Sequence, residues 1–168
     1  LKIRDMKPSW KIIVEIAEAT EDGTMPTEWV KLGEVKDGSI TPDNQEGTTK
    51  ELINTEGDVV DSFKFPDRLG WKMIVFGIPD ELKKKFWEVT DKNGVSQVKS
   101  MSNNKDFAVR MLAPDLPGTD AVAYPRCKVN MGMGYSNDDT FYSEIGIKVQ
   151  KPKNGVIFEH GPVEKIKG

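Results

Sequence analysis

The chain has 168 residues, of which 37% are hydrophobic and 30% are charged, so it is long enough to bury the core of one domain. Its 27 acidic and 24 basic residues give a net charge of −3, which disfavours dedicated DNA or RNA recognition because nucleic-acid binders are usually strongly basic. A single cysteine excludes an intramolecular disulfide, and no apolar run approaches the roughly 20 residues that a membrane-spanning helix needs.

The first predicted strand covers residues 11–19. Here Ile12, Val14 and Ile16 point to one side of an alternating apolar and polar pattern. Successive side chains on a strand point to opposite faces, so the pattern predicts a strand with one buried face.

Residues 29–52 read as two strands joined by a long polar loop. The loop, TPDNQEGTT at residues 41–49, is too long and too polar for a tight hairpin. Such loops are either mobile or docked on a partner. The segment carries no histidine and no cysteine, which indicates a role in assembly rather than in chemistry.

Two further strands follow. In residues 57–67 the side chains of Val59, Phe63 and Phe65 share one face, which predicts a half-buried strand. Residues 71–77 (WKMIVFG) are almost continuously apolar. Such a run predicts a central strand that is covered on both faces.

One segment has helical periodicity instead. Leu82, Phe86 and Val89 recur at intervals of four and three residues, which places them on one stripe of a helix. We predict a single α-helix over about residues 80–90 that lies against the sheet, with Asp80 as its N-cap.

The second half of the chain returns to alternation. Strands are predicted at residues 106–114, 126–134 and 143–151. The Asn-Gly pairs in the two KNG sequences, at residues 92–94 and 153–155, predict tight hairpin turns because both residues accept positive φ.

Together these elements predict a mainly β (α+β) fold. We expect a β-sandwich or partial β-barrel of about 8–10 strands with one flanking α-helix. No repeat or internal boundary divides the sequence, so residues 1–168 are predicted to form a single domain.

Few residues are candidates for catalysis. His160 is the single histidine and has no evident nucleophile partner, so an ordinary surface position is favoured. Cys127 alternates with Val129 and Met131, which predicts a small buried hydrophobe rather than a reactive thiol. The sequence therefore predicts no catalytic residue and no enzymatic activity.

Two motifs suggest a bound ion, and both are disfavoured. Asp138, Asp139 and Glu144 could hold calcium, but they lack the EF-hand spacing, so a solvated hairpin loop is favoured. Gly132 and Gly134 do not open a helix that could hold a phosphate, and they are predicted to mark a bend or the close approach of another backbone. We predict no metal and no cofactor.

The four tryptophans divide into two pairs. Trp71 and Trp87 adjoin the most apolar strand and the helix, which predicts packing roles. Trp10 and Trp29 are freer, and we predict that at least one of them lies at an interface, where tryptophan is enriched.

Read together, several segments resemble the major tail tube proteins of long-tailed bacteriophages. The stretches EWVKLGEVKDGSITPDNQEGTTKEL and GDVVDSFKFPDRLGWKMIVFGIPDELKKKFW are similar to the N-terminal half of that family. The stretch FAVRMLAPDLPGTDAVAYPRCKVNMGMGYSNDDTFYSEIGIKVQKPKNG is similar to its closing hairpins. The resemblance covers about residues 28–160 and is one of pattern and order; type VI secretion tubes and baseplate hubs share the fold.

The resemblance implies a structural subunit that assembles into hexameric rings. The rings would stack into a channel that conducts DNA as non-specific cargo, and other tail proteins would be partners. It implies no membrane, no small-molecule substrate and a location in the virion tail, after synthesis in the bacterial cytoplasm. Residues 1–27 do not align with the family and are predicted to be an N-terminal strand or an arm that reaches the next ring.

In such an assembly, we predict that the polar loop contacts the subunit above or below. The residues of this predicted contact are Thr41, Pro42, Asp43, Asn44, Gln45, Glu46, Gly47 and Thr48.

Two alternatives stay open. A non-catalytic surface- or carbohydrate-binding β-sandwich would need an exposed aromatic platform, for which Trp10 and Trp29 are the candidates. An enzyme that uses only carboxylates, such as Glu15, Asp61 or Glu144, would need two of them to converge in a cleft.

Overall fold

The computed structural model describes residues 11–167 except residue 117. The elements in chain order are β1 (Ile13–Glu18), β2 (Val30–Lys31), β3 (Glu34–Val35), β4 (Thr41–Pro42), β5 (Thr49–Ile53), β6 (Val59–Lys64), β7 (Gly70–Phe76), α1 (Asp80–Phe86), β8 (Glu88–Lys92), β9 (Val95–Ser100), β10 (Phe107–Leu112), β11 (Asp120–Ser136), β12 (Thr140–Val149), β13 (Glu159–Pro162) and α2 (Val163–Lys167). The described residues thus contain more strands than the 8–10 predicted, because several strands are only two residues long and leave no periodic pattern.

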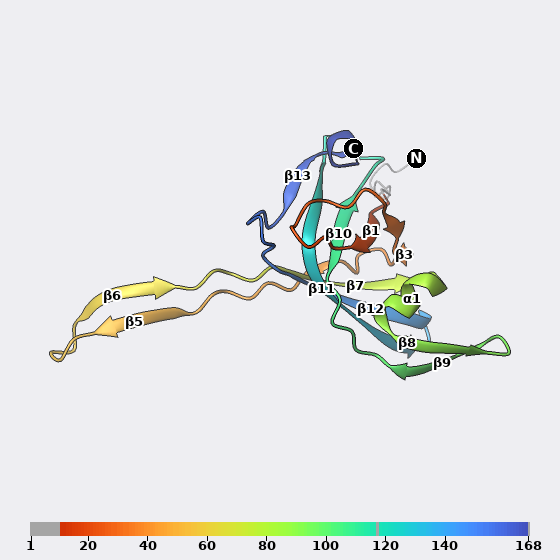
Figure 1. The fold of residues 1–168 in the computed structure, drawn as a ribbon, viewed down its shortest axis with the longest axis horizontal. Coiled ribbons are helices and arrows are strands. Elements are labelled where there is room, and N and C mark those ends of the chain that lie inside the picture. Colours follow the sequence, from red (N-terminus) through yellow and green to blue (C-terminus); the bar gives the residue numbers. More distant parts are fainter. Residues whose placement is uncertain (1–10, 117, 168) are drawn as a thin grey trace, which may run out of the picture.

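Most strands belong to one antiparallel sheet. Its order is β2-β1-β10-β11-β12-β7-β3, with β13 also paired to β11 and β4 also paired to β7. The sheet does not close on itself, and α1 packs beside it (Figure 1). The predicted mainly β class with a flanking helix is confirmed. The predicted N-terminal segment contributes β1, whereas residues 1–10 lie outside the described residues.

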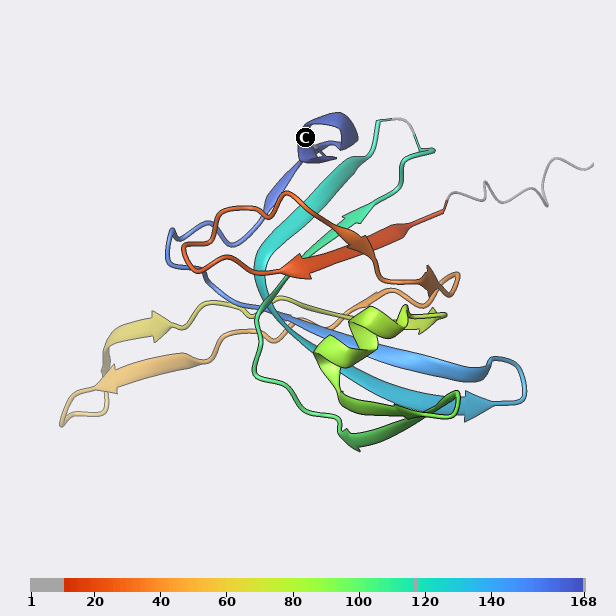
Figure 2. The same cartoon turned by 45° about the vertical axis from the view of Figure 1, so that its right-hand side comes forward.

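Strand β11 connects the two halves of this sheet. Its first half pairs with β10 and β13, and its second half pairs with β12. The register shifts between the pairs Phe107–Cys127 and Val109–Tyr124, so β11 has one extra residue there. Pro125, which has no N–H to give to a ladder, falls inside this bulge. A bulge bends a strand, and Figure 2 shows β11 curving from one half to the other.

The hydrophobic core is built from alternate residues of the long strands, as the alternation predicts, together with α1. Its fully or almost fully buried members include Val14 and Ile16 from β1, Met73 and Val75 from β7, Leu82 and Phe86 from α1, Phe107, Val109 and Met111 from β10, Cys127, Val129 and Met131 from β11, and Ile145 and Ile147 from β12.

The helix is shorter than predicted. It begins at Asp80 and ends at Phe86, and its N-cap residue is Pro79, which makes no side-chain capping hydrogen bond. The predictions of Asp80 as N-cap and of a helix to residue 90 are therefore wrong. Trp87 already has extended backbone angles, because the β-branched residues that follow continue as a strand.

Strands β8 and β9 form a short hairpin that accounts for this early end. Asn93 and Gly94 both have positive φ, 52° and 78°, as the Asn-Gly signal predicts for a tight hairpin. The second Asn-Gly pair also makes a turn, in which Gly155 N donates to Pro152 O at 3.0 Å. That turn does not join two adjacent strands, so the hairpin predicted there is wrong.

Strand β7 is central, as predicted, and lies between β12 and the short strands β3 and β4. It is not covered on both faces, however. Met73 and Val75 are buried in the core, but Lys72 on the opposite face is exposed and Ile74 is half-buried. That part of the prediction is wrong because the outer face of β7 leaves Lys72 in contact with water.

Candidate assembly surface

A long hairpin, defined here as residues 43–69, projects from the main sheet (Figure 1). Its two strands extend the pairing of β4 with β7 away from the main sheet. Asp43 N donates to Gly70 O at 2.8 Å, and Gln45 and Arg68 exchange two backbone hydrogen bonds of 2.8 Å each. The ladder then continues into β5 and β6. The backbone is therefore hydrogen-bonded from the sheet to the region near the tip.

The prediction of a polar loop at residues 41–49 is therefore wrong. Thr41–Pro42 forms β4, Gln45 forms a bridge to Arg68, and Thr49 begins β5. The segment is polar because a ladder with water on both faces needs no apolar side chains. The inter-subunit contact predicted for these residues remains a prediction.

The half-buried strand predicted at residues 57–67 is a strand, but it is not half-buried. Every residue of β6 is exposed. Val59, Phe63 and Phe65 expose 53%, 50% and 54% of their surface, so large apolar side chains face water along the hairpin. When such side chains form a large contiguous patch, the patch marks an interaction site in soluble proteins.

Gly47 sits where the two strands of the long hairpin lie in close contact. A Cβ atom on Gly47 would lie 1.6 Å from Phe65 O, so only glycine fits this crossing. Gly47 N also donates to Asp67 Oδ1 at 2.8 Å, and this hydrogen bond, followed by the charge of Lys64, lowers the pKa of Asp67. Gly47, one of the eight residues predicted to contact a neighbouring subunit, is therefore required for the close packing of its own hairpin.

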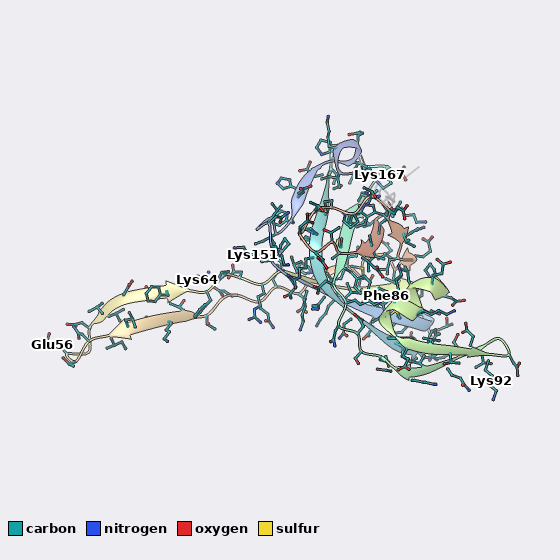
Figure 3. All side chains as sticks on the ribbon, viewed as in Figure 1. Glu56, Lys64, Phe86, Lys92, Lys151 and Lys167 are labelled. Carbon is teal, nitrogen blue, oxygen red and sulfur yellow. The ribbon has the colours of Figure 1, made fainter. Side chains whose placement is uncertain are left out.

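The tip of the long hairpin, defined as residues 53–60, is closed by Asn54. The Asn54 side-chain oxygen accepts from Glu56 N at 3.0 Å and from Asp58 N at 2.9 Å. Gly57 takes a positive φ of 87°, which a glycine adopts without strain. The tip is therefore an ordered turn, and Figure 3 shows Glu56 at the far end of the molecule.

A groove of about 990 Å³ lies where the long hairpin meets the main sheet, and we call it the base groove. One wall comes from the hairpin and includes Phe65 and Leu69. The other comes from the end of β12 and the segment after it, and includes Val149, Ile157 and Phe158. Apolar side chains therefore form part of both walls, and charged residues lie among them: Asp43, Glu46, Asp67, Arg68, Lys148 and Lys151.

Cys127 is fully buried in the core, which confirms its prediction as a small hydrophobe. Burial, and then the negative charge of Asp106, raise the pKa of the Cys127 thiol far above its ordinary value. A thiol that stays protonated is a poor nucleophile.

His160 is exposed on β13, which confirms the predicted surface position. Its Nδ1 lies 2.9 Å from Asp120 Oδ2 on the paired strand β11. Both side chains face water, so the pair is a surface contact between two strands.

The acidic residues of the possible calcium site belong to a hairpin between β11 and β12. Asp138 and Asp139 lie in its turn, and Asp139 Oδ2 forms an ion pair with Lys36 at 2.8 Å. Among residues 11–116 and 118–167, no group of three His, Cys, Asp or Glu side chains is placed to hold a metal ion.

The two glycines of β11 mark neither a phosphate loop nor the close approach of another backbone. A Cβ atom on Gly134 would collide with the ring of Tyr142, the residue directly opposite on β12. Gly132 has ordinary room. The predicted close approach of another backbone is therefore wrong at Gly134, where a side chain lies across the glycine, and the predicted bend stays a prediction.

The tryptophans behave largely as predicted. Trp87 is buried and donates from Nε1 to Met131 O at 2.8 Å, and Trp71 donates to Tyr124 Oη at 3.0 Å, which confirms their packing roles. The guanidinium of Arg110 lies 4.5 Å from the centre of the Trp29 ring. Trp10 lies outside the described residues, so the predicted interface role stays a prediction.

The structure does not bring the three candidate carboxylates together. Glu15 lies on β1 in an ion pair with Arg110, Asp61 lies on the exposed long hairpin, and Glu144 lies on β12. No helix among the described residues is long and apolar enough to span a bilayer.

Two parts of this surface were missed by sequence reasoning, the hairpin tip and the base groove. A signal was present for the exposed strands that carry the tip. Lys50, Glu51, Asp61 and Ser62 put polar residues on both faces of the two strands, which is typical of a hairpin that leaves the sheet. No comparable signal exists for the groove, since its walls come from segments about 80 residues apart.

No protein-family model matches the chain, and no curated protein matches it. Among solved structures, the chain is similar to a chain in the cryo-EM structure of an extracellular contractile injection system, the PVC sheath–tube complex in its extended state. The TM-score is 0.42 at 13% sequence identity, and the match covers 96% of this chain and 95% of that chain.

Proposed function

We propose that this protein is a structural subunit of a phage or prophage tail tube. In this proposal the subunits form hexameric rings, and the rings stack into a channel that conducts DNA as non-specific cargo. The protein would work without catalysis or cofactor in the virion tail, beside other tail proteins. The resemblance of residues 28–160 to tail tube proteins supplies the class.

The observation that carries the proposal is the long hairpin. Its strands are exposed on both faces and carry large apolar side chains, among them Phe63 and Phe65. An isolated two-stranded hairpin is only marginally stable in water. A partner that covers those side chains would stabilise it, and a self-assembling subunit has such a partner in each neighbouring copy.

Residues Thr41–Pro42 and 43–48 are part of this proposal. Thr41–Pro42 form β4 at the edge of the main sheet, residues 43–48 begin the long hairpin, and most of these side chains are exposed. We propose that this segment lies against the subunit above or below in the stack.

Negative-stain electron microscopy of the concentrated protein, together with native mass spectrometry over a concentration series, tests the function. Annular or tubular particles and a sixfold mass would support it. A protein that stays strictly monomeric at every concentration and binds members of a glycan panel would contradict it, and would favour the binding module instead.

A further inference from the structure

The base groove leaves apolar surface that its own chain does not cover. Ile157 and Phe158, on one wall, remain 41% and 42% exposed. Phe65, on the opposite wall, is 54% exposed. At about 990 Å³ the groove is at the upper end of the roughly 300–1,000 Å³ range of ligand pockets, so several side chains could enter it.

The rim of the base groove carries positive charge that is not neutralised within the described residues. Lys151 lines the groove, and Lys153 lies two residues later, in the turn closed by the hydrogen bond from Gly155 N to Pro152 O; both lysines are exposed. Among the described residues neither lysine takes part in an ion pair. The acids that line the groove, Asp43, Glu46 and Asp67, are each paired with Lys72 or Lys64. A groove with apolar side chains on both walls and unpaired lysines beside it fits an apolar segment that carries acids.

The hairpin tip has that chemistry. Ile53 and Val60 expose 61% and 63% of their surface, and Glu56 and Asp58 lie between them in the turn. The tip carries no basic residue, and in the described part of the chain neither acid forms an ion pair. Because Asn54 already fixes the turn, little conformational entropy would be lost on docking.

The tip cannot reach the groove of its own chain. Figure 3 shows Glu56 at the far end of the long hairpin and Lys151 at its base. Residues 43–54 in extended conformation span about 40 Å, at roughly 3.3 Å per residue. The two strands of the hairpin are paired with each other, and one wall of the groove is the hairpin itself.

We propose that the hairpin tip of one copy docks into the base groove of a second copy. Ile53 and Val59, which are paired across the two strands, would enter the groove, and Glu56 and Asp58 would face Lys151 and Lys153. The contact is heterologous, since each copy presents both a tip and a groove, and it can therefore continue from copy to copy. The inference rests on the proposed tube function and names the surface that receives the hairpin.

Charge reversal with rescue tests the pairing. The variants E56K/D58K and K151E/K153E should each weaken self-association on the order of tenfold or more, because like charges would meet at the rim. The combined four-residue variant should recover association. The matched control is K92E/K99E on the short hairpin, which makes the same change in charge away from the groove and should leave association unchanged.

Cross-linking gives a second readout that does not depend on affinity. A chain with Asp58→Cys and Lys153→Cys should form a ladder of disulfide-linked oligomers on a non-reducing gel. Either single-cysteine variant should give no ladder beyond a dimer. Cys127 does not compete, because it is buried.

The possible outcomes distinguish an error in the docking site from an error in the proposed tube function. If wild-type protein forms tubes but charge reversal at Lys151 and Lys153 changes nothing and no ladder forms, the docking site is wrong and the tube function stands. If wild-type protein does not assemble and no ladder forms, both are overturned. The docking site would be established if each charge reversal weakens self-association, the combined variant recovers it, and the double-cysteine variant forms the ladder of disulfide-linked oligomers.

Discussion

Arg110 is the most deeply buried charge among the described residues of the sheet. It lies directly opposite Glu15 across the β1–β10 pair, and its Nε and Nη2 donate to the two carboxylate oxygens at 3.1 and 3.2 Å. The ring of Trp29 covers the guanidinium. A bidentate pair shielded in this way is well satisfied, but either partner alone would be costly.

We expect Glu15→Ala to lower the free energy of unfolding by about 3–5 kcal/mol, because it leaves the Arg110 charge buried without a partner. The double variant Glu15→Leu/Arg110→Met should recover most of this loss, since it removes both charges. Urea denaturation measures the free energy of unfolding of both variants. The exposed pair Lys31–Glu34 is the control, where Lys31→Ala should cost no more than about 1 kcal/mol.

The pKa of the Glu34 carboxyl falls to about 2, and the hydrogen bond from Lys11, followed by that from Lys31, is the main cause. Its ordinary value is 4.5, so the stabilisation is fully present above pH 4.5 and is lost as pH falls towards 2. A carboxyl ¹³C NMR titration should show the low pKa in the wild type and a rise towards 4.5 in Lys11→Ala. An unchanged titration in that variant would contradict the assigned cause.

Some residue roles could be predicted from the sequence and others could not. The burial of Cys127 follows from alternation alone, because a strand places every second residue on the same face. The Glu15–Arg110 pair could not be predicted, since its members are 95 residues apart and nothing local links them. Local patterns show which face a residue occupies but not which residue it meets there.

At the scale of elements, the same limit explains the errors in α1 and the long hairpin. The stripe of Leu82 and Phe86 correctly predicted a helix, but Val89 continued the stripe by coincidence, because it belongs to β8. In β6 the alternation correctly predicted a strand. Periodicity cannot reveal whether a second layer covers that strand, so the exposure of Phe63 and Phe65 was missed.

The crossing at Gly47 gives a prediction for the long hairpin. Gly47→Ala should push the two strands of the hairpin apart, because the added methyl group overpacks the crossing at a cost of about 1–3 kcal/mol. Hydrogen exchange at the Phe65 amide should therefore accelerate roughly tenfold or more. Phe65 N donates to Thr48 O at 2.9 Å beside the crossing. Exchange of amides in β10 should not change, since the hairpin opens locally.

Gly132→Ala is the matched control for that experiment. It also places a methyl group on a strand glycine, but the nearest atom, Glu144 O, would be 3.8 Å away. Exchange in the long hairpin should stay at the wild-type rate. Equal effects of the two variants would show that the crossing does not depend on Gly47.

At the scale of the whole molecule, the long hairpin is separable from the core. Residues 49–64 are all exposed, and none belongs to the hydrophobic core. Their replacement by Asn-Gly, which would join the hydrogen-bonded residues Thr48 and Phe65, should shift Tm by no more than about 2–4 °C, the shift that about 1 kcal/mol produces in a chain of this size.

The same deletion should abolish self-assembly. Differential scanning calorimetry measures the first expectation, and sedimentation velocity measures the second. A variant that folds and still forms rings or tubes would contradict the role of the hairpin. A large fall in Tm would instead show that the hairpin supports the sheet.

The overall class of the fold was within reach of the sequence, whereas its connectivity was not. The strands of the core and the position of the helix follow from periodicity. The strand order does not, because β1 pairs with β10 and β3 with β7 across long stretches of chain. The bulge at Pro125 is a middle case, since a proline inside an apolar strand indicates an irregularity without locating its partner.

The pairing of β1 with β10 also determines when the sheet can form during synthesis. The ribosome releases β1 well before its partner, because Glu15 and its cross-strand neighbour Arg110 are 95 residues apart. Strands that wait for distant partners fold slowly and expose unpaired edges in the interval. The growing chain should therefore gain its native sheet only after residues 107–149 have emerged, and its early strands are natural clients for a chaperone.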